Sequence, residues 1–98
     1  MNRKLEALIE ILRGLEGQIR EQYRAEIVGV FGSYARGEQG AGSDLDVLTR
    51  FLEGATLFDF VGLGDFLEEK LGLRVDIVSE RSVREELREG IYEQVVRL

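Results

Sequence analysis

Residues 30–46 read VFGSYARGEQGAGSDLD, and this stretch determines the fold that we expect for the whole chain. An apolar run that ends at Phe31 leads into a Gly32-Ser33 turn. Ten residues, 34 to 43, separate this turn from Asp44-Leu45-Asp46, after which the chain becomes apolar again. Short apolar runs rich in Val and Ile are typical of buried strands. The stretch therefore predicts two strands joined by a glycine-rich loop.

Two acidic residues, Asp44 and Asp46, open the second of these strands two positions apart. On a strand, side chains at i and i+2 point to the same face, so the two carboxylates stand side by side while Leu45 and Val47 turn toward the core. Adjacent like charges are costly unless they are neutralised, and a divalent cation is the usual neutraliser. The pair therefore predicts a metal site.

The Gly32-Ser33 turn is the second chemical signal in this stretch. Such a turn offers free backbone N–H groups, which are the kind of surface that holds phosphate. A metal-bound carboxylate pair beside a phosphate-binding turn has the outline of a nucleotidyl-transfer site. Taken alone, a Gly-Ser sequence is more often only a turn, so the interpretation depends on the combination.

A third carboxylate, Asp76, interrupts an otherwise apolar run over residues 74–78. Aspartate is disfavoured in strands and is rarely buried without a partner. A single strand aspartate is more often an edge-strand solubility device. If this strand pairs with the strand that carries Asp44 and Asp46, however, the three side chains can meet on one face. Three carboxylates are the ligands expected for a two-metal phosphoryl-transfer site.

The composition limits the possible functions. At 98 residues, the chain is expected to form a single domain over residues 1–98. It lacks Cys and His, so any metal must be held by oxygen, which favours Mg²⁺, Mn²⁺ or Ca²⁺. The net charge of −6 argues against direct binding of nucleic acid. The chain contains no apolar run long enough to span a bilayer and no signal peptide, so we expect a cytoplasmic protein without membrane attachment.

The remaining elements follow from hydrophobic periodicity, turn residues and capping boxes. The expected order is α-β-β-α-β-α, an α/β (α+β) domain in which helices flank a small mixed sheet. In chain order we expect a helix over residues 3–22, a strand over Ala25–Phe31, one helical turn over Ser33–Arg36, a strand over Asp44–Phe51, a helix from the Thr56 cap to Gly72, a strand over Arg74–Val78 and a helix capped by Ser82 that continues toward Leu98.

The Gly32-Ser33 turn, the ten-residue spacer and Asp44-Leu45-Asp46 resemble the signature of the nucleotidyltransferase superfamily that includes DNA polymerase beta. The short chain and the Ala35-Arg36-Gly37 context are more similar to the minimal nucleotidyltransferases, which are antitoxins paired with HEPN-domain toxins. The likeness extends from the first helix to the last and implies the nucleotidyltransferase fold.

The resemblance also implies roles for the motif residues. Asp44 and Asp46 would ligate two Mg²⁺ ions, and Asp76 would complete the site and help to deprotonate the attacking hydroxyl. Gly32 and Ser33 would hold the phosphates of ATP. The implied reaction is transfer of AMP from ATP to a tyrosine of a partner HEPN-type RNase toxin, which neutralises the toxin.

Several alternatives remain open at the level of sequence. Arg36 either contacts the nucleotide phosphates or pairs with Glu38 and only fixes the turn. Tyr92 is either a site of self-modification or a half-buried core residue. The chain as a whole could instead be a non-catalytic antitoxin that acts by steric blockade, or the nucleotidyltransferase subunit of an enzyme that modifies small molecules.

Overall fold

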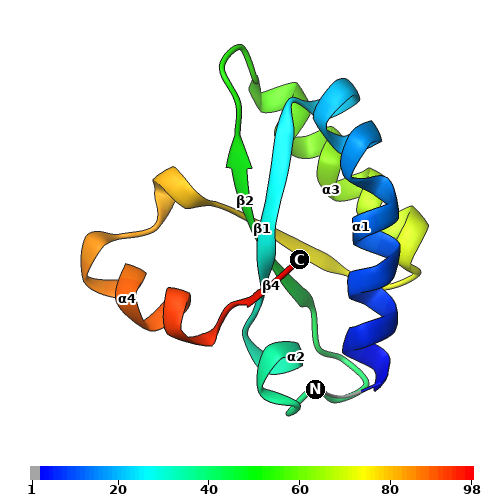
Figure 1. Cartoon of the computed structure of the whole chain (residues 1–98), viewed down its shortest axis with the longest axis vertical. Coiled ribbons are helices and arrows are strands. Elements are labelled where there is room, and N and C mark those ends of the chain that lie inside the picture. The colour runs from blue at the N-terminus through cyan, green and yellow to red at the C-terminus, as the bar shows by residue number, and fades with distance from the viewer. Residues whose placement is uncertain (1–2) are drawn as a thin grey trace.

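The centre of the molecule is a mixed four-stranded sheet in the order β3-β2-β1-β4. The computed structural model describes residues 3–98. Its elements follow one another as α1 (Arg3–Tyr23), β1 (Ala25–Phe31), α2 (Ser33–Arg36), β2 (Leu45–Phe51), α3 (Leu57–Leu71), β3 (Val75–Ser79), the 3-10 turn η1 (Glu80–Ser82), α4 (Glu85–Gln94) and β4 (Val96–Arg97), as Figure 1 shows. This architecture confirms the expected α/β class.

Strand pairing brings distant parts of the chain into register. β1 pairs antiparallel with β2, so that Phe31 lies opposite Asp46. β2 pairs in parallel with β3, and this register places Asp46 opposite Asp76. β4 pairs antiparallel with β1 through Gly29 and Val30. The register therefore joins the acidic pair, the third carboxylate and the end of β1 at one end of the sheet.

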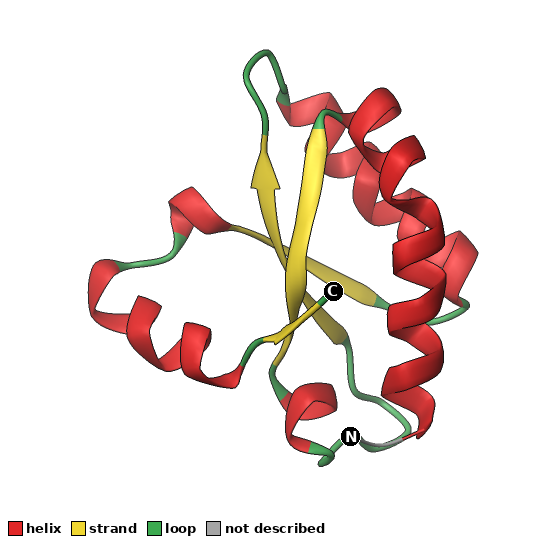
Figure 2. Cartoon of the chain, viewed as in Figure 1, coloured by secondary structure: helices red, strands yellow, loops and turns green. Residues whose placement is uncertain are grey.

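The core lies between the sheet and two long helices. α1 and α3 pack together on one side of the sheet, and α4 lies on the other side (Figure 2). α1 directs a stripe of leucine and isoleucine toward the sheet, as the spacing of residues 5–19 predicts. α3 is fixed at its start by a capping box, in which the Thr56 backbone N–H donates to Asp59 Oδ2 at 2.8 Å. The side chains that fill the core include Leu5, Leu12, Ile19, Val30, Leu45, Val47, Leu63 and Leu67.

The C-terminal region differs from the expectation. Ser82 belongs to η1 rather than capping a helix, and α4 begins only at Glu85 after two extended residues. α4 ends at Gln94, and Val96–Arg97 forms an edge strand instead of continuing the helix. The β-branched Val95 and Val96 favour a strand once an unpaired edge of β1 is available to them.

Two boundaries around the acidic residues also shift by one position. β2 begins at Leu45, so Asp44 lies just before the strand, and β3 begins at Val75 rather than at Arg74. No helix within residues 3–98 is both long enough and apolar enough to cross a membrane.

Candidate active site

Gly32 ends β1 and starts the single helical turn α2. Its φ of 75° and ψ of −152° lie in a region that is essentially restricted to glycine. A Cβ atom built on Gly32 would overlap Asp46 Oδ2, so the carboxylate lies directly against the backbone at this position. The glycine is therefore needed both for the turn and for the close approach of Asp46.

Asp46 and Asp76 form the closest acidic pair of the site. The parallel register of β2 and β3 places them opposite each other on the side of the sheet away from α1 and α3. Asp46 is half-buried, and its burial raises its pKa; the charges of Asp76 and Asp44 and a hydrogen bond with Asp76 raise it further, while Arg36 lowers it. The structure thus brings two of the three predicted carboxylates together, with a cost in repulsion that a cation would relieve.

The third predicted carboxylate, Asp44, lies nearby but is engaged differently. Its Oδ1 forms an ion pair with Arg74 Nε at 3.0 Å. Within residues 3–98, no group of three or more His, Cys, Asp or Glu side chains is placed so that it could hold a metal ion. The predicted convergence of three carboxylates is therefore limited to Asp46 and Asp76 in this structure, with Asp44 held by a guanidinium at the edge of the site.

Arg36 occupies the side of the site next to the Gly-Ser turn. Its Nε donates to Glu38 Oε1 at 2.7 Å, and its second nitrogen, Nη1, donates to Gln94 Oε1 of α4 at 3.1 Å. The contact with Glu38 is the turn-fixing arrangement, and the contact with Gln94 also ties α2 to α4. Arg36 nevertheless lines the pocket described below, together with Gly32 and Ser33.

One pocket of 490 Å³ is lined by Gly32, Ser33, Arg36, Asp44, Asp46 and Arg74, whereas Asp76, opposite Asp46 on the next strand, is not among its lining residues. Its floor comes from the Gly-Ser turn and the start of β2, and α4 supplies a wall through Ile91 and Gln94. Ligand pockets commonly measure roughly 300–1,000 Å³, so the space suits a nucleotide.

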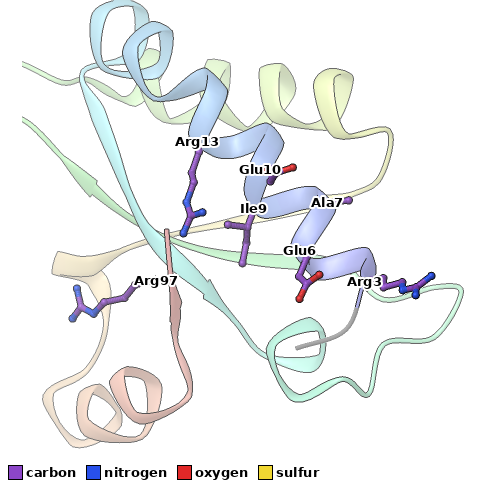
Figure 3. Close-up of a pocket in the computed structure, with 7 residues that line it drawn as sticks. All are labelled: Arg3, Glu6, Ala7, Ile9, Glu10, Arg13 and Arg97. Carbon is purple, nitrogen blue, oxygen red and sulfur yellow. The ribbon is translucent and has the colours of Figure 1, made fainter.

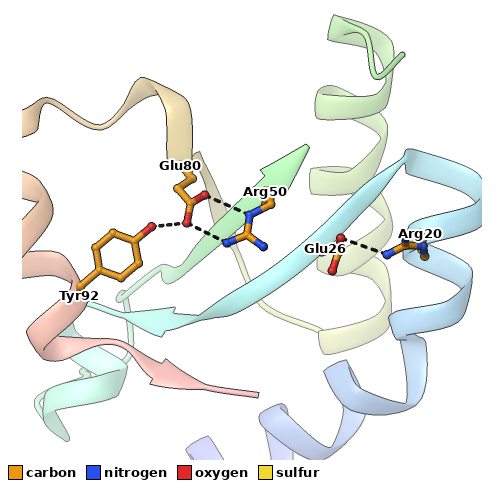
Figure 4. A network of polar contacts seen from close by, with 5 residues as sticks. All are labelled: Arg20, Glu26, Arg50, Glu80 and Tyr92. Carbon is orange, nitrogen blue, oxygen red and sulfur yellow. Dashed lines mark hydrogen bonds and ion pairs between the residues drawn. The ribbon is translucent and has the colours of Figure 1, made fainter. Parts of the chain in front are cut away.

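A chain of polar contacts holds α4 beside the sheet. Tyr92 of α4 donates its hydroxyl to Glu80 of η1, and Arg50 of β2 donates to the same carboxylate at 3.1 Å (Figure 4). Tyr92 is part-buried, as one of its two interpretations expected, but its contacts are polar rather than those of a core residue. Since α4 has no buried side chain, these polar contacts position this wall of the pocket.

A second pocket, of 650 Å³, lies between α1 and the C-terminal strand, away from the motif residues. Its lining mixes three arginines with two glutamates, mostly from one side of α1 (Figure 3). It contains none of the residues that the sequence singles out for chemistry. The Gly-Ser and carboxylate pocket is therefore the candidate active site.

Sequence reasoning missed three of the residues that line this site. Arg74 had a detectable signal, because it stands two positions before Asp76 and so shares its side of the chain. Ile91 and Gln94 had none, because only the path of the chain after η1 brings α4 next to the Gly-Ser turn.

Comparison with known proteins places this geometry in a family. Residues 12–97 match the family described as "Nucleotidyltransferase domain". The protein adenylyltransferase MntA of Thermococcus cleftensis is 39% identical over 94% of this chain and 93% of its own length. A protein of Methanocaldococcus jannaschii, MJ1215, provisionally described as a protein adenylyltransferase, is 38% identical over 81% of this chain and 92% of its own length.

Solved structures agree with this match. One that is provisionally described as a minimal nucleotidyltransferase superposes with a TM-score of 0.82 and 44% identity, and the match covers 96% of this chain and 95% of that chain. A crystal structure of a toxin-antitoxin with AMP-PNP superposes with a TM-score of 0.68 and 23% identity, over 98% of this chain and 72% of that chain. At that identity the second likeness shows the fold alone.

Proposed function

The chain belongs to the nucleotidyltransferase domain family, and on that premise we propose that it is an antitoxin that transfers AMP from ATP to a hydroxyl group of a partner toxin. The relative MntA is named a protein adenylyltransferase and matches nearly the full length of both chains. A chain with the same fold comes from a toxin-antitoxin crystallised with AMP-PNP. Both names support a protein acceptor and ATP as the donor.

The observation that carries the proposal is the register of β2 and β3. It places Asp46 opposite Asp76, and Asp46 lies against the Gly32 backbone at the start of the Gly32-Ser33 turn. Asp46 is thus held beside the backbone N–H groups that line the pocket, with Asp76 as its neighbour on the next strand. This arrangement suits a nucleoside triphosphate that arrives with a cation.

The donor atoms of the site suit Mg²⁺. They are carboxylate oxygens, and the chain has no His or Cys to favour a softer metal. Burial, and next the charges of Asp76 and Asp44, raise the pKa of Asp46, so a cation would relieve the cost of its negative charge. Asp46 and Asp76 would hold the ion, joined by Asp44. When bound, Mg²⁺ would neutralise the phosphate charge that develops during transfer.

The side chains then divide the remaining tasks. Gly32 and Ser33 bind the terminal phosphates through backbone N–H groups and the serine hydroxyl, and Arg36 adds a positive charge beside them. The acceptor hydroxyl attacks the α-phosphorus, the bond from this phosphorus to the bridging oxygen breaks, and pyrophosphate leaves. The proton of the hydroxyl passes to Asp76, whose exposed side chain is open to an incoming protein.

The partner that we propose is an RNase toxin of the HEPN class, with a tyrosine as the acceptor. The site is a pocket open to solvent on the side of the sheet away from α1 and α3, so the acceptor residue can be presented by another polypeptide. The net charge of −6 also complements a basic, RNA-binding partner and would favour fast association with it.

Label transfer tests this proposal. The purified chain is incubated with Mg²⁺, ATP labelled in the α-phosphate and a purified HEPN-class RNase toxin from the same organism, and the toxin is then analysed for label and for RNase activity. We expect label on a toxin tyrosine and loss of RNase activity, and we expect Asp46→Asn to reduce the transfer rate by at least about 100-fold.

The matched control is Asp65→Asn, which removes an exposed carboxylate of α3 outside the pocket. It should transfer label at the wild-type rate. Equal transfer by Asp46→Asn and wild type would refute the catalytic proposal. Neutralisation of the toxin by Asp46→Asn without any label would show that blockade, rather than AMP transfer, is the antitoxin mechanism.

A further inference from the structure

The predicted metal ligand Asp44 is paired with an arginine in this structure. Arg74 Nε lies 3.0 Å from Asp44 Oδ1, and Arg74 Nη2 also donates to the backbone carbonyl of Gly42 at 3.1 Å. One guanidinium therefore bridges the Asp44 carboxylate and the end of the glycine-rich loop. Asp44 is therefore paired with Arg74 and does not form a three-carboxylate group with Asp46 and Asp76 among residues 3–98.

The main chain fixes where this arginine can reach. The Leu45 N–H donates to the Arg74 carbonyl at 2.9 Å, and Leu45 lies opposite Val75 in the parallel ladder. Asp44 and Arg74 thus precede two paired strands at equivalent positions. Both side chains therefore lie at the same end of the sheet, where they line the nucleotide-sized pocket.

The ion pair between Arg74 and Asp44 lies at the surface of the protein. The two side chains are 73% and 47% exposed, and ion pairs this exposed contribute little to stability. A divalent cation competes strongly for a carboxylate next to Asp46. Once released, the guanidinium remains at the pocket, and phosphate is the ligand whose geometry it matches with paired N–H donors.

We propose that Arg74 is a positioning residue that neutralises Asp44 in the free protein and moves its guanidinium onto the nucleotide phosphates when Mg²⁺ binds Asp44. This inference rests on the proposed function and assigns one residue that the motif does not include. Binding of the cation by Asp44 and binding of the phosphates by Arg74 then occur together, as one exchange of ionic partners.

The exchange has an effect of opposite sign on two ligands. Without the guanidinium, Asp44 is free, so Mg²⁺ alone should bind more tightly. The complex of Mg²⁺ with a nucleotide should bind more weakly, because its phosphates lose a charged donor. An arginine that only held the loop in place, with no effect of its charge on either ligand, would change both affinities in the same direction or neither.

The test uses the full chain and two titrations of Arg74→Gln. In the first, MgCl₂ alone is followed by NMR shifts of backbone amides around the loop, and we expect roughly two- to fivefold tighter binding than in the wild type. In the second, AMP-PNP is titrated calorimetrically in saturating Mg²⁺, and we expect roughly three- to tenfold weaker binding.

Two further variants complete the design. Arg74→Lys keeps the charge without the planar fork and should fall between wild type and Arg74→Gln in both titrations. Arg81→Gln removes an exposed arginine of η1 outside the pocket and should match the wild type.

Arg74→Gln values that equal the wild type, or that shift the same way for both ligands, overturn the inference and leave the proposed function intact. A wild-type chain that binds no Mg²⁺ with AMP-PNP, alone or with its partner toxin, overturns both.

Discussion

At Gly32 two independent constraints exclude a side chain. The backbone conformation, with φ of 75°, costs a residue other than glycine about 1–3 kcal/mol. A methyl group would also overlap Asp46 Oδ2 and push the carboxylate away from the turn. We therefore expect Gly32→Ala to lower the free energy of unfolding by about 1–3 kcal/mol and to reduce AMP transfer by at least about 100-fold.

Urea unfolding and the label-transfer assay measure these two effects for Gly32→Ala. Gly40→Ala is the matched control from the same loop, because a Cβ at Gly40 meets no atom within 4 Å. It should leave stability and transfer nearly unchanged. Full activity of Gly32→Ala would show that Asp46 does not need its close approach to the turn.

Asp46 lowers the stability of the fold at neutral pH. Folding raises its pKa above the ordinary value of 3.8, chiefly through burial and next through the charges of Asp76 and Asp44. The folded state thus binds the proton more tightly than the unfolded chain does. The stabilisation of the folded state by protonated Asp46 is fully present below pH 3.8, and it is lost as the pH rises through the folded-state pKa.

Asp46→Asn should therefore raise the melting temperature of the metal-free protein, by about 2–5 °C at pH 7 for a domain of this size. The gain should shrink toward zero as the pH is lowered below 4. Differential scanning calorimetry in EDTA measures it, with Asp65→Asn as the control. A variant that melts lower than the wild type at pH 7 would contradict the prediction that Asp46 is held against repulsion.

The residues that the sequence revealed are those whose chemistry is local. Gly32-Ser33 and the Asp44/Asp46 pair stand within 15 positions, from 32 to 46, and their types alone indicate phosphate and metal binding. Asp76 could be identified from the sequence because an acidic residue in an apolar strand is unusual. The ion pair between Asp44 and Arg74 could not be predicted from the sequence, because it depends on the register of two strands that are separated by 23 residues, from 52 to 74.

Among the elements, α4 is the one held by polar contacts instead of a core. Tyr92 donates to Glu80, and this hydrogen bond is the main cause that raises the pKa of Tyr92 and lowers the pKa of Glu80, with Arg50 as the next cause for Glu80. The Tyr92 contribution is present below pH 10 and is lost as the pH rises through the folded-state pKa. The Glu80 contribution is present above pH 4.5 and is lost as the pH falls through its folded-state pKa.

Tyr92→Phe removes the hydrogen bond between Tyr92 and Glu80. At pH values between the folded-state pKa of Glu80 and that of Tyr92, the variant should hold α4 less firmly against the rest of the protein. We expect a loss of less than about 1 kcal/mol in global stability, because the contact is partly exposed. The weakening of nucleotide binding should be larger, since Ile91 and Gln94 of α4 line the pocket. Calorimetric titration with AMP-PNP and Mg²⁺ at pH 7 measures it, and unchanged affinity would show that α4 is not a functional wall.

Most elements could be predicted because their apolar periodicity matches their secondary structure. α1 and α3 follow the expected boundaries closely, and the Thr56 capping box forms as predicted. The C-terminal error has a specific cause, because the spacing of Val83, Leu87 and Ile91 is helical even though the chain around it is not one helix. The strand at Val96 forms through pairing with β1, at Gly29, where a side chain would overlap the Val96 carbonyl.

For the molecule as a whole, burial is distributed unevenly between the two sides of the sheet. The side facing α1 and α3 holds the continuous core, whereas α4, on the other side, buries no side chain (Figure 1). Segments with few buried apolar contacts open locally at low free energy, while core strands open only with the whole fold. We therefore expect the candidate active site to lie between a rigid sheet and a wall, α4, that opens locally.

Hydrogen exchange followed by mass spectrometry tests this division. In the free protein, amides of β1 and β2 should exchange most slowly, and those of α4 should exchange orders of magnitude faster, because α4 needs only local opening. Adding Mg²⁺ and AMP-PNP should slow exchange in α4 near Ile91 and Gln94 and in the loop near Gly42, since all three line the pocket.

The exposed first turn of α3, around Phe58, is the internal control and should not change, because it lies at the opposite end of β2. Exchange in α4 as slow as in β2 before any ligand is added would mean that the wall is already fixed, and nucleotide entry would then have to occur without its movement.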